Sequence, residues 1–296
     1  MEPALAEKTY GIIGLGLMGG SFAFALRDEV LGEKGRIFAL DEKKAALDHA
    51  CESGIIDKGF LPGEAPVMLS LCNIVFICLY PSQTIDFLLS NAPFFQADSI
   101  VTDISGVKSA LEHCLPHILE NASFDFISGH PMAGSEKEGF LHAQPAIFRG
   151  RNYILLPSPR NRRENLALLK TLIRKIGFNR IIETDAATHD RKIAFTSQLC
   201  HIIAAALVDS AEDVRITEFG GGSFEDLTRI AMINAPLWTE LFISNKTELL
   251  PHIEKFEKAL KTYKQLLQTE NTGFLRATLA EVRKKRMEMG YSTSAG

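Results

Sequence analysis

A histidine held between a glycine and a proline is the first feature of the sequence that could do chemistry. It lies in the segment FDFISGHPMAGSEKEGF, where a short apolar run ends at Gly129 and is followed by His130 and Pro131. Proline disfavours helical backbone angles in the residue before it, which restricts where the imidazole of His130 points. Because an imidazole titrates near neutral pH, it can serve here as a general base or accept a hydrogen bond. From position alone, a histidine that merely caps a turn is an equally good interpretation.

A glycine-rich loop near the N-terminus is the second such feature. Gly14, Gly16 and Gly19 follow an apolar run with the spacing GxGxxG and open a helical pattern. In dinucleotide-binding folds such glycines allow a tight turn, a close approach of the backbone to a pyrophosphate, and the packing of helix on strand. The helix that follows offers free N–H groups to the phosphates. The residues predicted to contact the cofactor in this loop are Gly14, Leu15, Gly16, Leu17, Met18 and Gly19.

Asp41 ends the next apolar run, 22 residues after Gly19. Dinucleotide-binding proteins carry an acid at about this distance, where it hydrogen-bonds the ribose of the cofactor. Since a carboxylate there repels a 2′-phosphate, the sequence favours NAD over NADP. Lys43 and Lys44 lie close behind and can soften this preference, although solvated charges on the next helix are the alternative interpretation.

Short apolar runs alternate with helical patterns through the first 183 residues, which predicts βαβ units and a parallel sheet. In an open α/β sheet, ligands bind outside the carboxyl ends of the strands. The loops expected at those ends are the glycine loop and residues 79–82, 103–106 and 128–131. We therefore predict that Tyr80 and Pro81 contact the cofactor and that His130 lies on the cofactor rim. Ser105 is expected near enough to orient its ring.

The sequence changes character after residue 183, because no strand pattern follows and apolar residues recur at helical spacing. The fold class is thus α/β, with a Rossmann-type dinucleotide-binding domain over residues 8–183. An all-helical dimerisation domain is expected over residues 184–296. Its apolar helix faces are numerous for its size, so a homodimer that covers some of them is expected.

Three consecutive glycines in the second domain precede Arg229, in the segment GGGSFEDLTR. Such a run is costly unless the backbone must bend or approach something closely. A guanidinium suits the bidentate capture of a carboxylate, which makes Arg229 a candidate for binding an anionic substrate. A salt bridge to Glu225 or Asp226 is the alternative.

Composition and charge argue against several classes of protein. The net charge is −4 and the pI is about 6.1, which indicates no basic surface for nucleic acid. No secretory signal is expected, and the uncharged stretch 9–26 contains five glycines, which favours a strand, turn and helix start over a membrane span. The five cysteines are expected to be reduced thiols in a cytoplasmic protein. No metal site is predicted, since His113 and His117 lack a third ligand.

Four motifs together resemble the prephenate/arogenate dehydrogenase family. They are GIIGLGLMGGSFA, GHPMAGSEKEG, the S-x-L-x-H element from Ser197 to His201, and GGGSFEDLTRIA. The resemblance extends from about Tyr10 to Arg286 and implies a Rossmann-type domain joined to a helical dimerisation domain. It implies the oxidative decarboxylation of prephenate to 4-hydroxyphenylpyruvate in tyrosine biosynthesis. An arogenate dehydrogenase that forms tyrosine directly is the alternative.

The resemblance also implies roles for individual residues. His130 would take the proton of the substrate's ring hydroxyl as hydride leaves the same carbon. Arg229 would bind a substrate carboxylate, and His201 would help to hold the side chain. The remaining residues expected to contact the substrate are Ser135, Glu136 and Ser197, with Glu136 as a possible partner for the α-ammonium group of arogenate.

Two positions depart from the family's pattern. Gly106 stands where the family usually has a serine bonded to the catalytic histidine, so either Ser105 replaces that serine or His130 lacks the partner. Gln198 replaces a histidine, so no ionisable group is available there. A β-hydroxyacid dehydrogenase and a non-catalytic NAD-sensing protein are competing interpretations. The first uses a lysine in its second domain, where this chain has Arg229.

Overall fold

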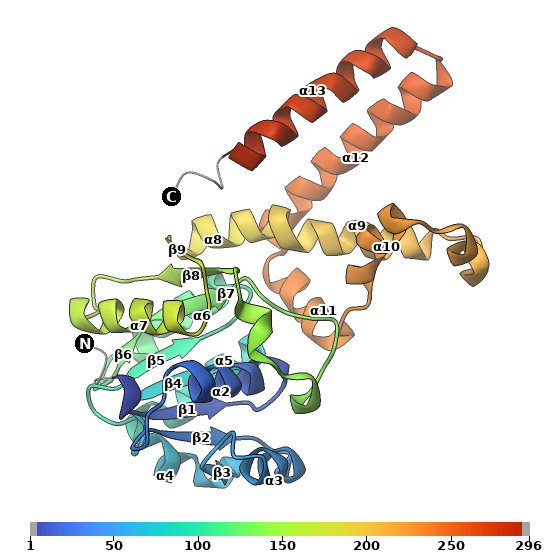
Figure 1. Ribbon diagram of the computed structural model, residues 1–296. Coiled ribbons are helices and arrows are strands. Elements are labelled where there is room, and N and C mark those ends of the chain that lie inside the picture. The colour runs from blue at the N-terminus through green and yellow to red at the C-terminus, as the bar shows by residue number, and fades with distance from the viewer. Residues whose placement is uncertain (1–4, 292–296) are drawn as a thin grey trace. The chain divides into compact units, whose positions relative to one another are not determined.

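The computed structural model describes residues 5–291, and the chain divides into two compact units (Figure 1). The first unit ends at Asn245 and contains all the strands of the described residues. The second begins at Lys246 and consists of two helices, α12 (Lys246–Gln268) and α13 (Thr272–Tyr291), which form a helical hairpin.

A parallel sheet of six strands forms the centre of the first unit, in the order β3-β2-β1-β4-β5-β6 (Figure 1). The strands are β1 (Thr9–Ile13), β2 (Arg36–Leu40), β3 (Lys58–Phe60), β4 (Ile74–Ile77), β5 (Ile100–Asp103) and β6 (Asp125–Phe126). The strand order reverses between β1 and β4, which opens a crevice at their carboxyl ends. This sheet confirms the predicted Rossmann-type fold, although the short edge strand β3 gave no recognisable signal in the sequence.

Apolar side chains cover both faces of this sheet. Ile12 and Ile13 are successive residues of β1 and belong to two different buried clusters, because neighbouring side chains of a strand point to opposite faces. Phe22 of the helix after the glycine loop stacks on Phe76 and packs at a tilt against Phe148 in the first cluster. The helices of this part of the chain are α2 (Leu17–Glu29), α3 (Lys44–Glu52), α4 (Ala65–Leu69), α5 (Pro81–Asn91), α6 (Ser109–Ile118) and α7 (Arg163–Lys175).

A second sheet contains the histidine segment. It has three strands in the order β7-β8-β9, namely β7 (Ser128–Pro131), β8 (Asn152–Leu156) and β9 (Arg180–Glu183). Strand β7 pairs antiparallel with β8, so that His130 lies opposite Ile154. The expectation of a loop over residues 128–131 is therefore wrong. Pro131 is compatible with a strand here because β7 is an edge strand, where a missing N–H costs no hydrogen bond.

No strand follows Glu183 within the described residues. The helices of the first unit beyond that point are α8 (Ala186–Ile193), α9 (Leu199–Asp209), α10 (Gly222–Thr228) and α11 (Ala235–Ser244). Helices α8 and α9 are joined by a π-helical turn over Ala194–Gln198. Asp185 caps α8 by accepting a hydrogen bond from the Thr188 amide at 2.8 Å.

The combined helix Ala186–Asp209 is long and apolar enough to span a membrane by length and composition alone. Core helices of soluble proteins have the same properties. Its polar residues His189, Asp190 and Gln198 are buried and hydrogen-bonded within the protein. This pattern indicates a helix that supports a polar site rather than one that faces lipid.

Replacing Gly19 by alanine is expected to separate α2 from the glycine loop. An added Cβ would lie 2.0 Å from the Gly14 carbonyl oxygen, so the helix has to shift. We expect a loss of about 1–3 kcal/mol in the free energy of unfolding, together with weaker NAD binding, measured by urea denaturation and calorimetric titration. Gly63→Ala is the control, since a Cβ there meets no atom within 4 Å; equal stability of the two variants would contradict the prediction.

Candidate active site

The glycine loop forms an open cradle at the crevice between β1 and β4. Gly14 has a φ of +86°, a conformation that favours glycine, and a Cβ there would lie 2.8 Å from the Cys78 carbonyl oxygen. At Gly16, in contrast, a Cβ would meet no atom within 4 Å, so this side of the loop is free for a ligand. Leu17 and Met18 begin α2, whose first N–H groups receive no side-chain cap from Gly16. The cradle therefore fits the pyrophosphate of a dinucleotide.

Asp41 lies at the end of β2 and is fixed beside this cradle. Its Oδ2 accepts a hydrogen bond from the Leu15 amide at 2.7 Å, and its Oδ1 accepts one from the Lys43 amide at 2.8 Å. On the other side of the crevice, Tyr80 and Pro81 begin α5. The structure thus brings the residues predicted to contact the cofactor to one edge of the sheet, as the topology requires.

His130 is the first member of a chain of three side chains. Its Nδ1 lies 2.8 Å from Nε2 of His189, and Nδ1 of His189 lies 2.7 Å from Oδ1 of Asp190. His189 and Asp190 are buried residues of α8. Asp190 is itself held by the amides of Lys108 and Ser109 at 2.9 and 2.8 Å and by the Ser109 hydroxyl at 2.5 Å.

The carboxylate at the end of this chain fixes the tautomers of both rings. A carboxylate only accepts hydrogen bonds, so Nδ1 of His189 carries the proton and its neutral ring presents a lone pair on Nε2. His130 must then donate from Nδ1, which leaves a lone pair on its own Nε2. The arrangement leaves Nε2 of His130 free to accept a proton, with the orientation of its ring set from α8.

Charge and burial keep these imidazoles neutral. Burial lowers the pKa of His130 well below 6.5, and the neighbouring His189 and Lys108 lower it further. Burial also lowers the pKa of His189, although its hydrogen bond to Asp190 opposes this effect. Burial alone would raise the pKa of the Asp190 carboxyl, but hydrogen bonds from His189, Ser109 and the backbone keep it below its usual value. Asp190 therefore remains charged and can stabilise a proton taken up by His130.

A buried ion pair holds the backbone on which His130 stands. The Lys108 ammonium lies 2.6 Å from Oδ2 of Asp103 and donates to the Gly129 carbonyl at 2.5 Å. Oδ1 of Asp103 accepts from the Ser128 hydroxyl at 2.7 Å and from the Gly129 amide at 3.2 Å. The side chains of both charged residues are at most 1% exposed. Both polar groups of Gly129 are therefore fixed immediately before the histidine.

Ser105 does not orient the ring of His130. Its Oγ is buried and has no hydrogen-bond partner, and the Nδ1 position that it would have to reach is taken by His189. Of the two alternatives left by the sequence, the structure supports the one in which His130 lacks the usual serine. A Cβ at Gly106 would lie 3.8 Å from Nε2 of His130 and 3.2 Å from the side chain of Leu241. Nε2 of His130 therefore lies near Gly106, which also packs beside the side chain of Leu241 in α11.

Arg229 pairs with the histidine segment and not with its own helix. Its guanidinium lies 3.4 Å from Oε2 of Glu136, so two residues predicted to contact the substrate are brought together. The hydroxyl of Ser135 accepts a hydrogen bond from the Lys137 amide at 3.2 Å and shapes this turn. The pair is partly exposed, which leaves the guanidinium available to an anionic ligand.

His201 completes this side of the site. Its Nδ1 donates to the Ser197 carbonyl at 2.9 Å, and its ring stacks on Trp238 with 3.6 Å between centroids. Burial, and to a lesser degree the charge of Arg229, lower the pKa of His201. Ser197 thus contributes its backbone oxygen to the orientation of His201.

The side chain of Gln198 has a structural role. Its amide donates to the Leu241 carbonyl at 2.8 Å and accepts from Asn245 at 2.7 Å, and Asn245 also donates to the Asp190 carbonyl at 3.0 Å. A neutral amide that both donates and accepts suits this position better than a charged group would. Gln198, which stands where the family has a histidine, therefore connects α8, α9 and α11 through hydrogen bonds.

Four residues of the site were missed by the sequence analysis: Lys108, His189, Asp190 and Leu241. The adjacent polar residues His189 and Asp190, which precede the long apolar stretch of α9, were the available signal, since buried polar residues need a partner. Lys108 and Leu241 gave no such signal.

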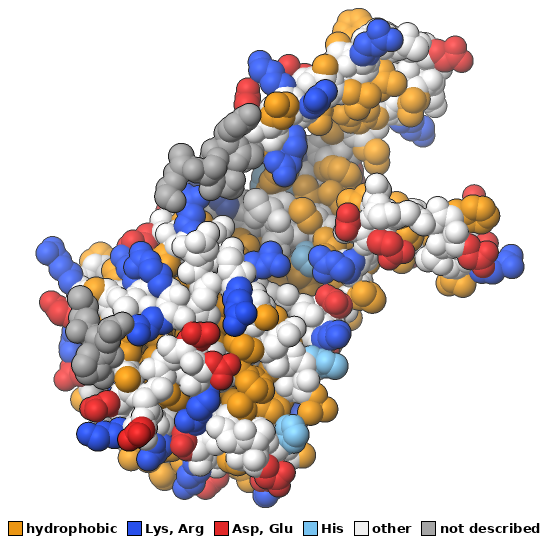
Figure 2. All heavy atoms as spheres, in the orientation of Figure 1, with side chains coloured by type: hydrophobic (Ala, Val, Ile, Leu, Met, Phe, Trp, Pro, Cys, Tyr) orange, Lys and Arg blue, Asp and Glu red, His pale blue; other side chains and the backbone are white. Residues whose placement is uncertain are grey.

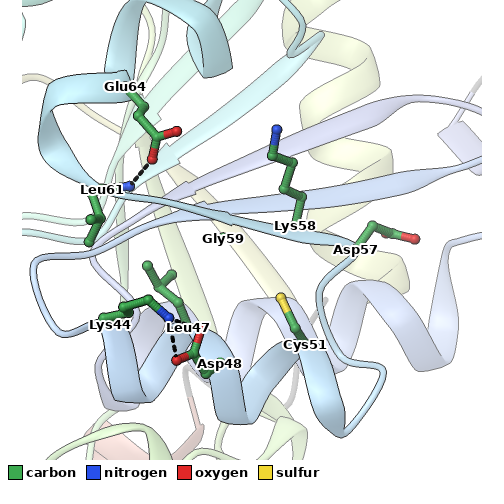
Figure 3. Close-up of a pocket in the computed structure, with 9 residues that line it drawn as sticks. All are labelled: Lys44, Leu47, Asp48, Cys51, Asp57, Lys58, Gly59, Leu61 and Glu64. Carbon is green, nitrogen blue, oxygen red and sulfur yellow. Dashed lines mark hydrogen bonds and ion pairs between the residues drawn. The ribbon is translucent and has the colours of Figure 1, made fainter.

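A separate groove of about 350 Å³ lies between α3 and β3 (Figure 3). None of the predicted site residues lines it. Its charged side chains are engaged locally: Lys44 with Asp48, Asp57 with Arg27, and Glu64 with the Leu61 amide. The groove adds nothing to the chemistry of the crevice.

Comparison with known proteins agrees with this geometry. Residues 22–182 match the family model described as the nucleotide-binding domain of prephenate dehydrogenase, and residues 185–281 match the one described as its dimerization domain. The prephenate dehydrogenase of Lactococcus lactis is 31% identical over 84% of this chain and 68% of that protein. The cyclohexadienyl dehydrogenase of Zymomonas mobilis is 26% identical over 95% of this chain and 96% of that protein.

A solved structure shows the same architecture. The prephenate dehydrogenase of Aquifex aeolicus, in complex with hydroxyphenyl propionate and NAD+, superposes with a TM-score of 0.83 and 32% identity over 95% of this chain and 98% of that one. The glycine cradle, the histidine relay and these matches lead to one conclusion: the chain belongs to the prephenate dehydrogenase family and is an NAD-dependent oxidoreductase.

Proposed function

We propose that this protein catalyses the NAD-dependent oxidative decarboxylation of prephenate to 4-hydroxyphenylpyruvate, a step of tyrosine biosynthesis. The observation that carries the proposal is the relay from Asp190 through His189 to His130, which leaves a free lone pair on Nε2 of His130. A hydroxyl beside this nitrogen can lose its proton as the carbon that bears it is oxidised. Arogenate is the alternative substrate, since relatives include a cyclohexadienyl dehydrogenase.

In the proposed reaction, Nε2 of His130 accepts the proton of the hydroxyl on C4 of the substrate. The positive charge that forms on the imidazole is stabilised through His189 by the buried carboxylate of Asp190. Bound NAD supplies the acceptor for the hydride that leaves C4. Loss of the ring carboxylate as carbon dioxide makes the ring aromatic, and His130 returns the proton to the phenolate oxygen. The balance is one prephenate and one NAD consumed, with one 4-hydroxyphenylpyruvate, one carbon dioxide and one reduced cofactor formed.

The second-domain residues are proposed to hold the substrate's side chain. Arg229 is placed to bind the side-chain carboxylate by exchanging its partner Glu136 for the substrate. Burial and, to a lesser degree, the charge of Arg229 lower the pKa of His201, whose ring is oriented by the Ser197 carbonyl. Ser135 lies in the same turn as Glu136. Glu136 is also the group that would pair with the α-ammonium of arogenate, so it is the residue to test for substrate choice.

We further propose a domain boundary between residues 183 and 184 and a homodimer formed through the helical domain. The boundary is supported by the two matched family regions, which end at residue 182 and begin at residue 185, whereas the compact units of the structure divide after Asn245. The dimer is supported by the description of the second region as a dimerization domain and by apolar side chains exposed on its helices (Figure 2). On α13 these include Phe274, Leu279 and Val282. Five free thiols support a cytoplasmic location.

The first test is the formation of reduced nicotinamide with prephenate and with arogenate, each offered NAD and then NADP. We expect turnover of prephenate with NAD and a decrease of at least about 10²-fold in kcat for His130→Asn, which removes the base. The Asn variant should still bind NAD. Absence of turnover with every pair, despite NAD binding, would leave the NAD-sensing interpretation in its place.

Breaking the relay is expected to slow the reaction without weakening cofactor binding. His189→Ala removes the acceptor for Nδ1 of His130, so the ring loses its fixed orientation and tautomer. We expect kcat to fall by on the order of 10²-fold, while the NAD dissociation constant from calorimetric titration stays unchanged. Thr196→Ala, an exposed position on the same helical segment, is the matched control. A His189→Ala enzyme with wild-type kcat would refute the relay.

The pH dependence follows from the lowered pKa of His130. Only the neutral ring accepts a proton, so activity is lost as the pH falls through the pKa of His130, which lies below 6.5. We expect the acidic limb of kcat/KM to have its midpoint below pH 6.5, measured from pH 4.5 to 8 in buffers of constant ionic strength. A midpoint at or above 6.5 would show that the base is solvated or is another group.

Removal of the Arg229 side chain is expected to affect binding more than chemistry. Arg229→Leu should raise KM for prephenate by about 10- to 100-fold, the value of hydrogen bonds to a charged group. Its kcat should change much less. Arg229→Lys keeps the charge but loses the bidentate geometry, so its KM should lie between that of the wild type and that of Arg229→Leu. A change confined to kcat would place Arg229 outside the binding step.

A further inference from the structure

The carboxylate of Glu240 connects two parts of the site that serve different molecules. Its Oε1 accepts a hydrogen bond from the Ser82 amide at 2.5 Å, between residues 158 positions apart in the sequence. Ser82 is the second residue of α5, which begins at the cofactor crevice. Glu240 belongs to α11, on the substrate side of the site.

The start of α5 has a particular need for this carboxylate. Pro81 has no N–H, so the Ser82 amide is the first donor that the helix offers. The N-terminus of a helix also carries a partial positive charge, which a carboxylate stabilises. A hydrogen bond from an amide to an ionised carboxylate is about twice as strong as one between neutral groups. The contact is therefore a specific connection between α5 and α11.

The same turn of α11 carries two residues of the substrate side. Leu241, next to Glu240, packs beside Gly106, close to the base nitrogen of His130. Trp238, two residues earlier, stacks on His201. The position of α11 relative to α5 therefore determines where these side chains lie with respect to the cofactor crevice.

We propose that Glu240 is a positioning residue that couples NAD binding to substrate binding by fixing α11 on the N-terminus of α5. When the cofactor binds against the start of α5, the contact holds Leu241 and Trp238 in the arrangement that the substrate needs. A substrate bound against α11 stabilises the cofactor loop in return, because such coupling is reciprocal. This inference rests on the function proposed above.

The test measures NAD affinity by calorimetric titration with and without 4-hydroxyphenylpropionate as a non-reacting substrate analogue. In the wild-type protein the analogue should tighten NAD binding by about fivefold or more. In Glu240→Ala this coupling should fall below about twofold, while NAD affinity without the analogue changes less. Glu240→Gln keeps an acceptor oxygen but loses the charge, so it should retain part of the coupling. Asp86→Ala removes an exposed carboxylate from α5 itself and should behave as wild type.

The outcomes separate this inference from the proposed reaction. Absence of coupling in the wild type, or full coupling in Glu240→Ala, overturns the role of Glu240 even if prephenate is turned over. If thermal unfolding shows that Glu240→Ala does not fold, full coupling in Glu240→Gln overturns the role of Glu240 instead. The binding measurement needs no turnover, so a failure of the reaction itself is detected separately in the nicotinamide assay.

Discussion

The buried ion pair between Lys108 and Asp103 is the interaction on which the site depends. Two opposite charges removed from water are tolerated only when further hydrogen bonds satisfy their remaining atoms. Here those bonds go to Ser128 and to both polar groups of Gly129, so the cost of burial is offset by fixing the strand that carries His130. The amide of Lys108 also binds Asp190, so one residue stabilises both the backbone and the relay.

Two networks thus converge on a single imidazole from opposite sides. The Rossmann-type sheet fixes its backbone through Asp103, at the end of β5, whereas α8 of the helical part fixes its ring through His189. The cofactor cradle and the base therefore share one scaffold, although the groups that orient the base lie more than fifty positions along the chain. This explains how a partly exposed histidine can keep one tautomer and one direction.

Much of the fold was predictable because it follows from local patterns. Glycine spacing and apolar runs predicted the sheet, the crevice and the position of Asp41, and the change of pattern after residue 183 predicted the helices. The histidine segment was misassigned as a loop, because its short strand pairs with a distant segment that local pattern does not reveal. Lys108 and Leu241 could not be found since their roles arise from burial and tertiary contacts. Ser105 was expected near His130 because both follow strands at the same edge of the sheet, but this placement does not determine where a hydroxyl points.

The π-helical turn between α8 and α9 has a consequence for the rotational phase of the helix. His189 and His201 are twelve residues apart, and regular winding at about 100° per residue would place them about 120° apart around the axis. A π turn accommodates one extra residue with little added rotation, which reduces this offset to about 20°. Both histidines can then face the same side of one continuous helix. If the same twelve residues were wound as a regular helix, without the π turn, the two histidines would lie about 120° apart although every side chain of the site would still be in the sequence.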